Sequence, residues 1–158
     1  MSTAPVPSDW AVLAARLDRI ESRQAIERLV ANTCHGTDKR EEETFLGVWH
    51  EDGVWVRPQG DFQGREELRR ALKAFVWGTW QSTQHWATNL VTEIQGDAAS
   101  GMFDMSMQGV NADGKSAFMC ATYNDRYERR DGRWGVVHRQ FKLKYFSLAH
   151  GIQFAPPA

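Results

Sequence analysis

Two polar side chains in apolar surroundings are the residues of this sequence best suited to start a reaction. His85 opens an alternating stretch beside Trp86, and histidine is the side chain that most readily accepts a proton near neutral pH. Asp38 follows a helical stretch, where the helix dipole disfavours a negative charge, so its carboxylate needs another partner. A carboxylate bonded to one imidazole nitrogen fixes the tautomer and raises the basicity of the other nitrogen. The pair therefore suggests proton abstraction.

Arg139 is a third candidate. In the last predicted strand it shares one face with Val137, Phe141 and Leu143, because side chains alternate across a strand. A guanidinium on an apolar face must find an acceptor. It would either stabilise a leaving group or an oxyanion, or form an internal ion pair. The other two candidates also have plain alternatives, namely a structural histidine bonded to the backbone and an aspartate that forms a turn or a cap.

Other reactive motifs are missing from the sequence. It has no GxGxxG, P-loop, HExxH or GxSxG pattern, so nucleotide binding, zinc proteolysis and serine hydrolysis have no support. Cys34 and Cys120 are far apart and lie outside any CxxC or Cys/His cluster. We therefore expect reduced, buried thiols rather than a disulfide or a metal site.

The composition is that of an ordinary globular domain. The 158 residues predict a single domain, 1–158, and the formal charge of -1 argues against nucleic acid and an anionic membrane as partners. Seven Trp and eight Phe are enough to line a pocket as well as a core. The start MSTAPVPSDW lacks the features of a signal peptide, and no stretch is apolar enough to span a bilayer. We expect a cytoplasmic protein.

The elements that must position these residues run from helices to strands. Helical periodicity covers residues 9–36 as two helices or one bent one, then 38–49 and 64–80, with a short strand at 54–57. Four long strands, 84–95, 100–110, 116–128 and 134–145, alternate with turn signals and predict an antiparallel meander. Residues 1–8 are expected to form a mobile arm and 147–158 an extended tail. The order predicts an α+β fold, a bent sheet around helices with one open end.

A second apolar stripe bears on assembly. Ala117, Met119, Ala121 and Tyr123 alternate along one strand, which suggests that even the second face of the sheet is apolar and covered by another subunit. We expect a homo-oligomer.

The sequence also resembles a known family. The segments SRQAIERL, TDKREEETFLGVWHEDGVW, TQHWATNL, YNDRYERRDGRW and GIQFAPP, over roughly residues 17–157, resemble the SnoaL-like branch of the nuclear transport factor 2-like superfamily. They are most similar to the γ-hexachlorocyclohexane dehydrochlorinase family, and more distantly to the scytalone dehydratase and bile-acid 7α-dehydratase families. The resemblance implies a cone-shaped barrel, with N-terminal helices packed in a strongly curved, mixed, mostly antiparallel sheet and a pocket inside. It also favours a trimer over a dimer.

The resemblance assigns roles to individual residues. It implies a His–Asp dyad with no metal or organic cofactor, the base falling on His85, the carboxylate on Asp38 and a pocket arginine on Arg139. The family's pocket lysine falls on Thr33. Because that cation assists a departing chloride, its replacement favours dehydration over dehydrohalogenation. The residues expected to bind substrate are Thr33, Trp86, His138 and Phe141.

The function expected from these residues is a cofactor-independent lyase that performs β-elimination on an apolar, cyclic small molecule. An isomerase would use the same base. A non-catalytic binding or assembly module, and the small accessory subunit of a ring-hydroxylating oxygenase, are the alternatives outside this chemistry, because a fold does not fix a function.

Overall fold

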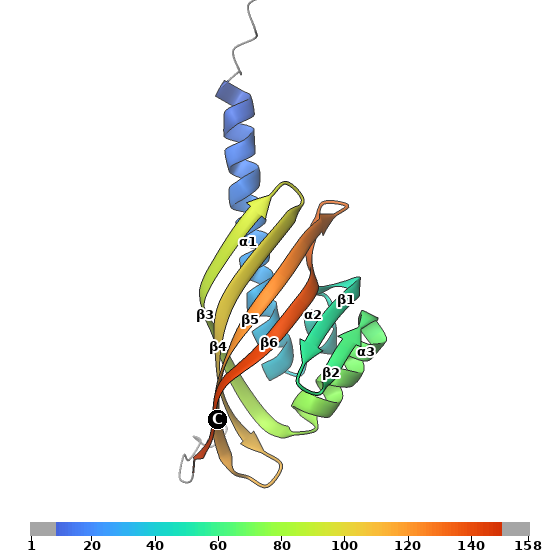
Figure 1. Ribbon diagram of the computed structural model, residues 1–158, viewed down its shortest axis with the longest axis vertical. Helices are drawn as coiled ribbons and strands as arrows, with labels where there is room; N and C mark the ends of the chain where they lie inside the picture. Colours follow the sequence, from blue (N-terminus) through green and yellow to red (C-terminus); the bar gives the residue numbers. More distant parts are fainter. Residues whose placement is uncertain (1–8, 150–158) are drawn as a thin grey trace, which may run out of the picture.

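The computed structural model describes residues 9–149, and Figure 1 shows helices packed on one twisted sheet. The expected arm at 1–8 lies outside the described residues, and so does the tail from residue 150. The strand that precedes this tail runs to Ala149, so the first three residues of the expected tail belong to the sheet.

Helix α1, Asp9–Asp38, is a single helix of 30 residues. No proline or glycine interrupts it before Gly36, so of the two expected forms the pair of separate helices does not occur. Its C-terminal half is buried through Ile26, Leu29 and Val30, whereas Leu17, in its N-terminal half, is 55% exposed. Figure 1 shows this half of α1 projecting beyond the sheet. The change in phase of the apolar pattern therefore marks where the helix leaves the core.

Short elements follow α1 and cross to the sheet. They are α2 (Glu42–Leu46), β1 (Trp49–Arg57), β2 (Gly60–Gln63), α3 (Gly64–Leu72) and a π-helical turn η1 (Lys73–Trp77). Strand β2 was not expected from the sequence. It pairs antiparallel with β1 through a hairpin in which Arg57 opposes Gly60, and Gly60 has a φ of 133° that favours glycine. Pro58 does not end the sheet there, because it lies in the two-residue turn.

The four long strands form the meander that the sequence predicts. They are β3 (Trp80–Gln95), β4 (Ala98–Asn111), β5 (Ser116–Arg130) and β6 (Arg133–Ala149), and each pairs antiparallel with the next. Strand β1 joins β6 in parallel, which gives the order β2-β1-β6-β5-β4-β3. The α+β fold with a mixed, mostly antiparallel sheet is therefore confirmed. The sheet begins at β2 and ends at β3, and it does not close into a barrel.

One face of the sheet packs against the C-terminal half of α1. Val30 and Cys34 of α1 form a buried cluster with Phe103, Met105 and Tyr123 from β4 and β5. The stripe on β5 that was assigned to a second, subunit-covered face belongs to this inner face instead. Ala117 and Ala121 are 1% and 2% exposed, and Met119 and Tyr123 line a cavity there. Alternation identifies a shared face correctly, but it does not say which face meets the helices.

A close approach between α1 and α2 sets the end of α1. Gly36 has no side chain, and a Cβ built there would lie 2.5 Å from the backbone nitrogen of Phe45 and 2.8 Å from its Cα. Because backbone atoms cannot move aside as a flexible side chain does, only glycine permits this contact. The contact lies two residues before Asp38 and so helps to place its carboxylate.

The substitution Gly36→Ala is predicted to lower the free energy of unfolding by about 1–3 kcal/mol, as overpacking does in a tight interior. Urea denaturation of the two proteins measures this. Gly78→Ala is the comparison variant, because Gly78 also has helical backbone; a methyl there lies 3.0 Å from two carbonyl oxygens of its own turn, a looser fit than at Gly36, so the loss of unfolding free energy should be smaller. Equal stability of Gly36→Ala and the unchanged protein would contradict this account of the packing.

Candidate active site

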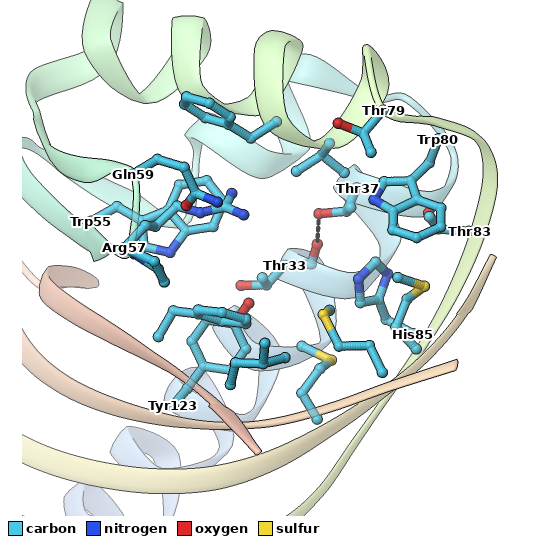
Figure 2. Close-up of a pocket in the computed structure, with 18 of the residues that line it drawn as sticks. Thr33, Thr37, Trp55, Arg57, Gln59, Thr79, Trp80, Thr83, His85 and Tyr123 are labelled. Atoms are coloured by element: carbon cyan, nitrogen blue, oxygen red, sulfur yellow. Dashed lines mark hydrogen bonds between the residues drawn. The ribbon is translucent and has the colours of Figure 1, made fainter. Parts of the chain in front are cut away.

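A cavity of about 330 Å³ lies between the sheet, α1 and the π-helical turn (Figure 2). Its size is that of a small-molecule site. Aromatic and sulfur-containing side chains form much of its wall, among them Trp55, Phe75, Trp80, Met105, Met107 and Phe146. Between them lie a few polar side chains, namely those of Thr33, Thr37, Arg57, Thr83 and His85. Some of the many Trp and Phe side chains therefore line this cavity, as expected.

Asp38 and His85 meet at one side of the cavity. Asp38 is the last residue of α1 and His85 lies on β3, yet Oδ1 of the carboxylate is 2.5 Å from Nδ1 of the ring. The backbone N–H of His85 donates to Oδ2 at 2.7 Å, and the hydroxyl of Thr83 donates to Oδ1 at 2.7 Å. The side chains are 9% and 10% exposed. The structure thus brings the two predicted residues together, and Thr83 is a third member that the sequence did not reveal.

The environment of Asp38 sets the proton positions in this pair. Burial disfavours its charge, but the hydrogen bonds and the charge of His85, with the bond from Thr83, outweigh burial and hold the pKa of Asp38 below its usual value. An ionised carboxylate only accepts hydrogen bonds, so Nδ1 of His85 must carry the proton of the short bond. In the neutral ring Nε2 then has a free lone pair, and the ring lines the cavity.

Arg139 is buried behind the cavity rather than on its wall. It is 0% exposed, and its guanidinium donates to both carboxylate oxygens of Asp125, at 2.9 and 2.6 Å. Burial alone would lower the pKa of Arg139, but the charge of Asp125 outweighs it and raises that pKa. Its Nη1 also donates to the hydroxyl of Thr33 at 2.9 Å, and Thr33 does line the cavity. Of the two roles open to Arg139, the internal ion pair is the one present here.

The four residues expected to bind substrate divide between the two faces of the sheet. Thr33 and Phe141 line the cavity. Trp86 is 46% exposed and is not part of the cavity wall, because it alternates with His85. His138 pairs with Arg126 on the outer face, where a register shift in β6 follows Val136. Trp86 and His138 therefore lie outside this cavity, since strand alternation, and for His138 a bulge, turns them away from it.

Other chemically interesting residues were missed or are inert. Arg57, at the end of β1, lines the cavity, although no role was expected for it. Cys34 and Cys120 are free thiols, Cys34 buried and Cys120 half-buried. Burial raises the pKa of Cys34 to about 11, so its thiol stays protonated at neutral pH. Within residues 9–149, no three or more His, Cys, Asp and Glu side chains gather in a way that could hold a metal ion.

Comparisons with known proteins agree with this fold. A family model described as a SnoaL-like domain matches residues 18–140. Hexachlorocyclohexane dehydrochlorinase 1 of Sphingobium indicum is 34% identical over 144 residues, which cover 89% of this chain and 94% of that protein. The crystal structure of a hexachlorocyclohexane dehydrochlorinase from Novosphingobium barchaimii matches with a TM-score of 0.84 and 34% identity, over 90% of this chain and 99% of the other.

A more distant structure shares the fold alone. A nuclear transport factor 2-like superfamily protein from Salmonella enterica has a TM-score of 0.71 and 13% identity, over 78% of this chain and 94% of that one. No described helix is long and apolar enough to cross a membrane. The match along residues 18–140 and the dehydrochlorinase relatives agree, and the chain belongs to the SnoaL-like family.

Proposed function

We propose that this protein is a cofactor-independent lyase that eliminates HX from a cyclic small molecule, with His85 as the base. The observation that carries the proposal is the contact between His85 and Asp38 at the wall of an apolar cavity. A pocket that only bound a ligand would not need a buried carboxylate beneath its histidine, because burying that charge costs free energy. Relatives named as dehydrochlorinases support the same class of reaction.

In the proposed reaction, Nε2 of His85 takes a proton from a ring carbon. The electron pair of the broken C–H bond forms the new double bond, and the group X leaves the neighbouring carbon with its own bonding pair. The imidazolium that results is stabilised by the charge of Asp38 and returns its proton to solvent or to X⁻. General-base catalysis of this kind contributes about 10²–10⁴-fold to the rate.

The leaving group X is either a halide or hydroxide. The names of the relatives favour chloride. Thr33 favours hydroxide, because its hydroxyl donates to the carbonyl oxygen of Leu29 and accepts from Arg139, and so offers no cation to a departing chloride. An isomerase would use the same base and return the proton to another carbon. The small subunit of a ring-hydroxylating oxygenase is less suited, because its pocket would be filled or blocked.

Replacing either residue of the pair is predicted to remove the activity. His85→Gln should lower turnover by about 10²–10⁴-fold, the usual contribution of a general base. Asp38→Asn should lower it severely as well, because an amide no longer fixes the tautomer. Chloride release from γ-hexachlorocyclohexane and formation of cyclohexenone from 3-hydroxycyclohexanone measure the two forms of the reaction.

Two variants outside the cavity control for nonspecific effects. His138→Gln changes a histidine on the outer face, and Asp104→Asn changes an exposed carboxylate that accepts hydrogen bonds from Asn89 and Thr122. Both should keep full activity. Turnover by His85→Gln at the rate of the unchanged protein would exclude this mechanism.

We further propose that the protein forms a homo-oligomer, with a trimer favoured over a dimer. Large apolar side chains are exposed on the N-terminal half of α1 and on the outer face of the sheet, including Trp10 at 80%, Val91 at 61% and Met102 at 50%. Exposed apolar patches of this kind mark association surfaces. The occupant proposed here is a second and third copy of this chain.

The predicted mass in solution is three times the 18.0 kDa of the chain, measured by light scattering after size exclusion. Val91→Glu should reduce it, because a charge would be buried in the contact. A monomer at micromolar concentration would contradict the proposal.

A further inference from the structure

Arg57 is a half-buried cation whose guanidinium has no hydrogen-bond acceptor among the described residues. Two of its guanidinium nitrogens, Nε and Nη1, are buried and form no hydrogen bond, and the side chain forms no ion pair with the described residues. Its Cζ lies 4.4 Å from the centroid of a Trp55 ring, 5.5 Å from that of Phe75 and 5.6 Å from that of Phe141. The rings attract the cation electrostatically, but they supply no hydrogen-bond acceptor.

Arg139, in the same interior, has a hydrogen-bond acceptor for each of its guanidinium nitrogens. It reaches both oxygens of Asp125 and the hydroxyl of Thr33, and so uses donors on all three nitrogens. Arg57 has no such carboxylate. An arginine cannot shed its proton to escape this cost, even though burial lowers the pKa of Arg57. A charge left in this condition is compensated when an anion binds.

The position of Arg57 says where that anion would lie. Arg57 and Gln59 lie on the side of the cavity opposite His85 and Thr83, as Figure 2 shows, with Thr33 and Thr37 between them. The hydroxyl of Tyr123 also points into this space. The Nε1–H of Trp55, on the same strand as Arg57, is another buried donor with no partner among the described residues. Donors thus gather at one end of the cavity, facing the proposed base.

We propose that Arg57 binds a carboxylate of the substrate, so that the substrate is an anionic ring compound rather than a neutral one. This substrate class rests on the proposed elimination reaction, whereas the carboxylate site itself does not. The planar guanidinium matches a carboxylate with two parallel hydrogen bonds, which a single halide ion cannot accept in that way. With the carboxylate held at Arg57, the ring spans the apolar middle of the cavity and presents a C–H to His85.

The test compares two probes of nearly equal shape, cyclohexanecarboxylate and cyclohexanecarboxamide, by titration calorimetry. The unchanged protein should bind the carboxylate at least about tenfold more tightly than the amide. Arg57→Met should weaken carboxylate binding by about 10- to 100-fold, the range of a charged hydrogen bond, and leave amide binding as it was. Arg57→Lys should keep part of the preference, because it keeps the charge but not the planar fork.

Two controls separate this proposal from others. Arg70→Met removes an exposed arginine paired with Glu67 and should change nothing. His85→Ala should keep the preference for the carboxylate over the amide. If the unchanged protein binds the carboxylate but shows no elimination activity, the proposed reaction is refuted and the carboxylate site is not. Conversely, elimination from neutral rings that is as fast as elimination from ring carboxylates would support the reaction and refute the substrate class.

Three results would overturn the carboxylate site. They are equal affinity for the amide and the carboxylate, unchanged carboxylate binding by Arg57→Met, and displacement of the carboxylate by chloride at equal concentration, which would indicate a halide site. The melting temperature of each variant shows whether a loss of binding comes from a loss of folded protein. Without ligand, Arg57→Met should melt above the unchanged protein, because an uncompensated buried charge is gone. A much lower melting temperature would assign Arg57 to the fold instead.

Discussion

The bond between the Asp38 carboxylate and the His85 ring is the interaction on which the site depends. It places a negative charge at the C-terminal end of α1, where the helix dipole opposes it, and buries that charge beside an apolar cavity. Three hydrogen bonds from Thr83 and His85 offset the cost. Because these donors all come from β3, the bond also joins the end of the helix to the edge strand of the sheet. The packing at Gly36 brings the chain to this point.

Two arginines in or beside the cavity, Arg139 and Arg57, differ in whether a carboxylate neutralises their charge. The charge of Arg139 is neutralised by Asp125. Arg139 also donates one hydrogen bond to Thr33, so it holds a side chain that lines the cavity without lining the cavity itself. Arg57 keeps its charge unpaired within the described part of the chain. A fold that tolerates such a cost at one position commonly does so at a functional site. The cavity thus has the His85 ring at one end and the Arg57 guanidinium at the other, with aromatic side chains between them.

The architecture could be predicted well, because long strands with clear turns and an amphipathic helix end can be recognised from local sequence patterns. The sequence also paired His85 with Asp38, partly from residue types and partly from resemblance. It did not predict which face of the sheet Trp86 and His138 occupy, because alternation shows that residues share a face but not which face is inner, and the register shift after Val136 cannot be read from composition. It missed Arg57, since a charged residue at a strand end is usually solvated, and only the packing of three rings around it shows otherwise.

The proton on the His85 ring is the most direct test of the central claim, which is that Asp38 holds Nδ1–H and leaves Nε2 free to act as a base. Nitrogen-15 NMR of ring-labelled protein at neutral pH reports the tautomer without any substrate. The account predicts a protonated Nδ1 with a strongly downfield proton, an unprotonated Nε2, and loss of this pattern in Asp38→Asn. A ring that carries its proton on Nε2 in the unchanged protein would contradict it.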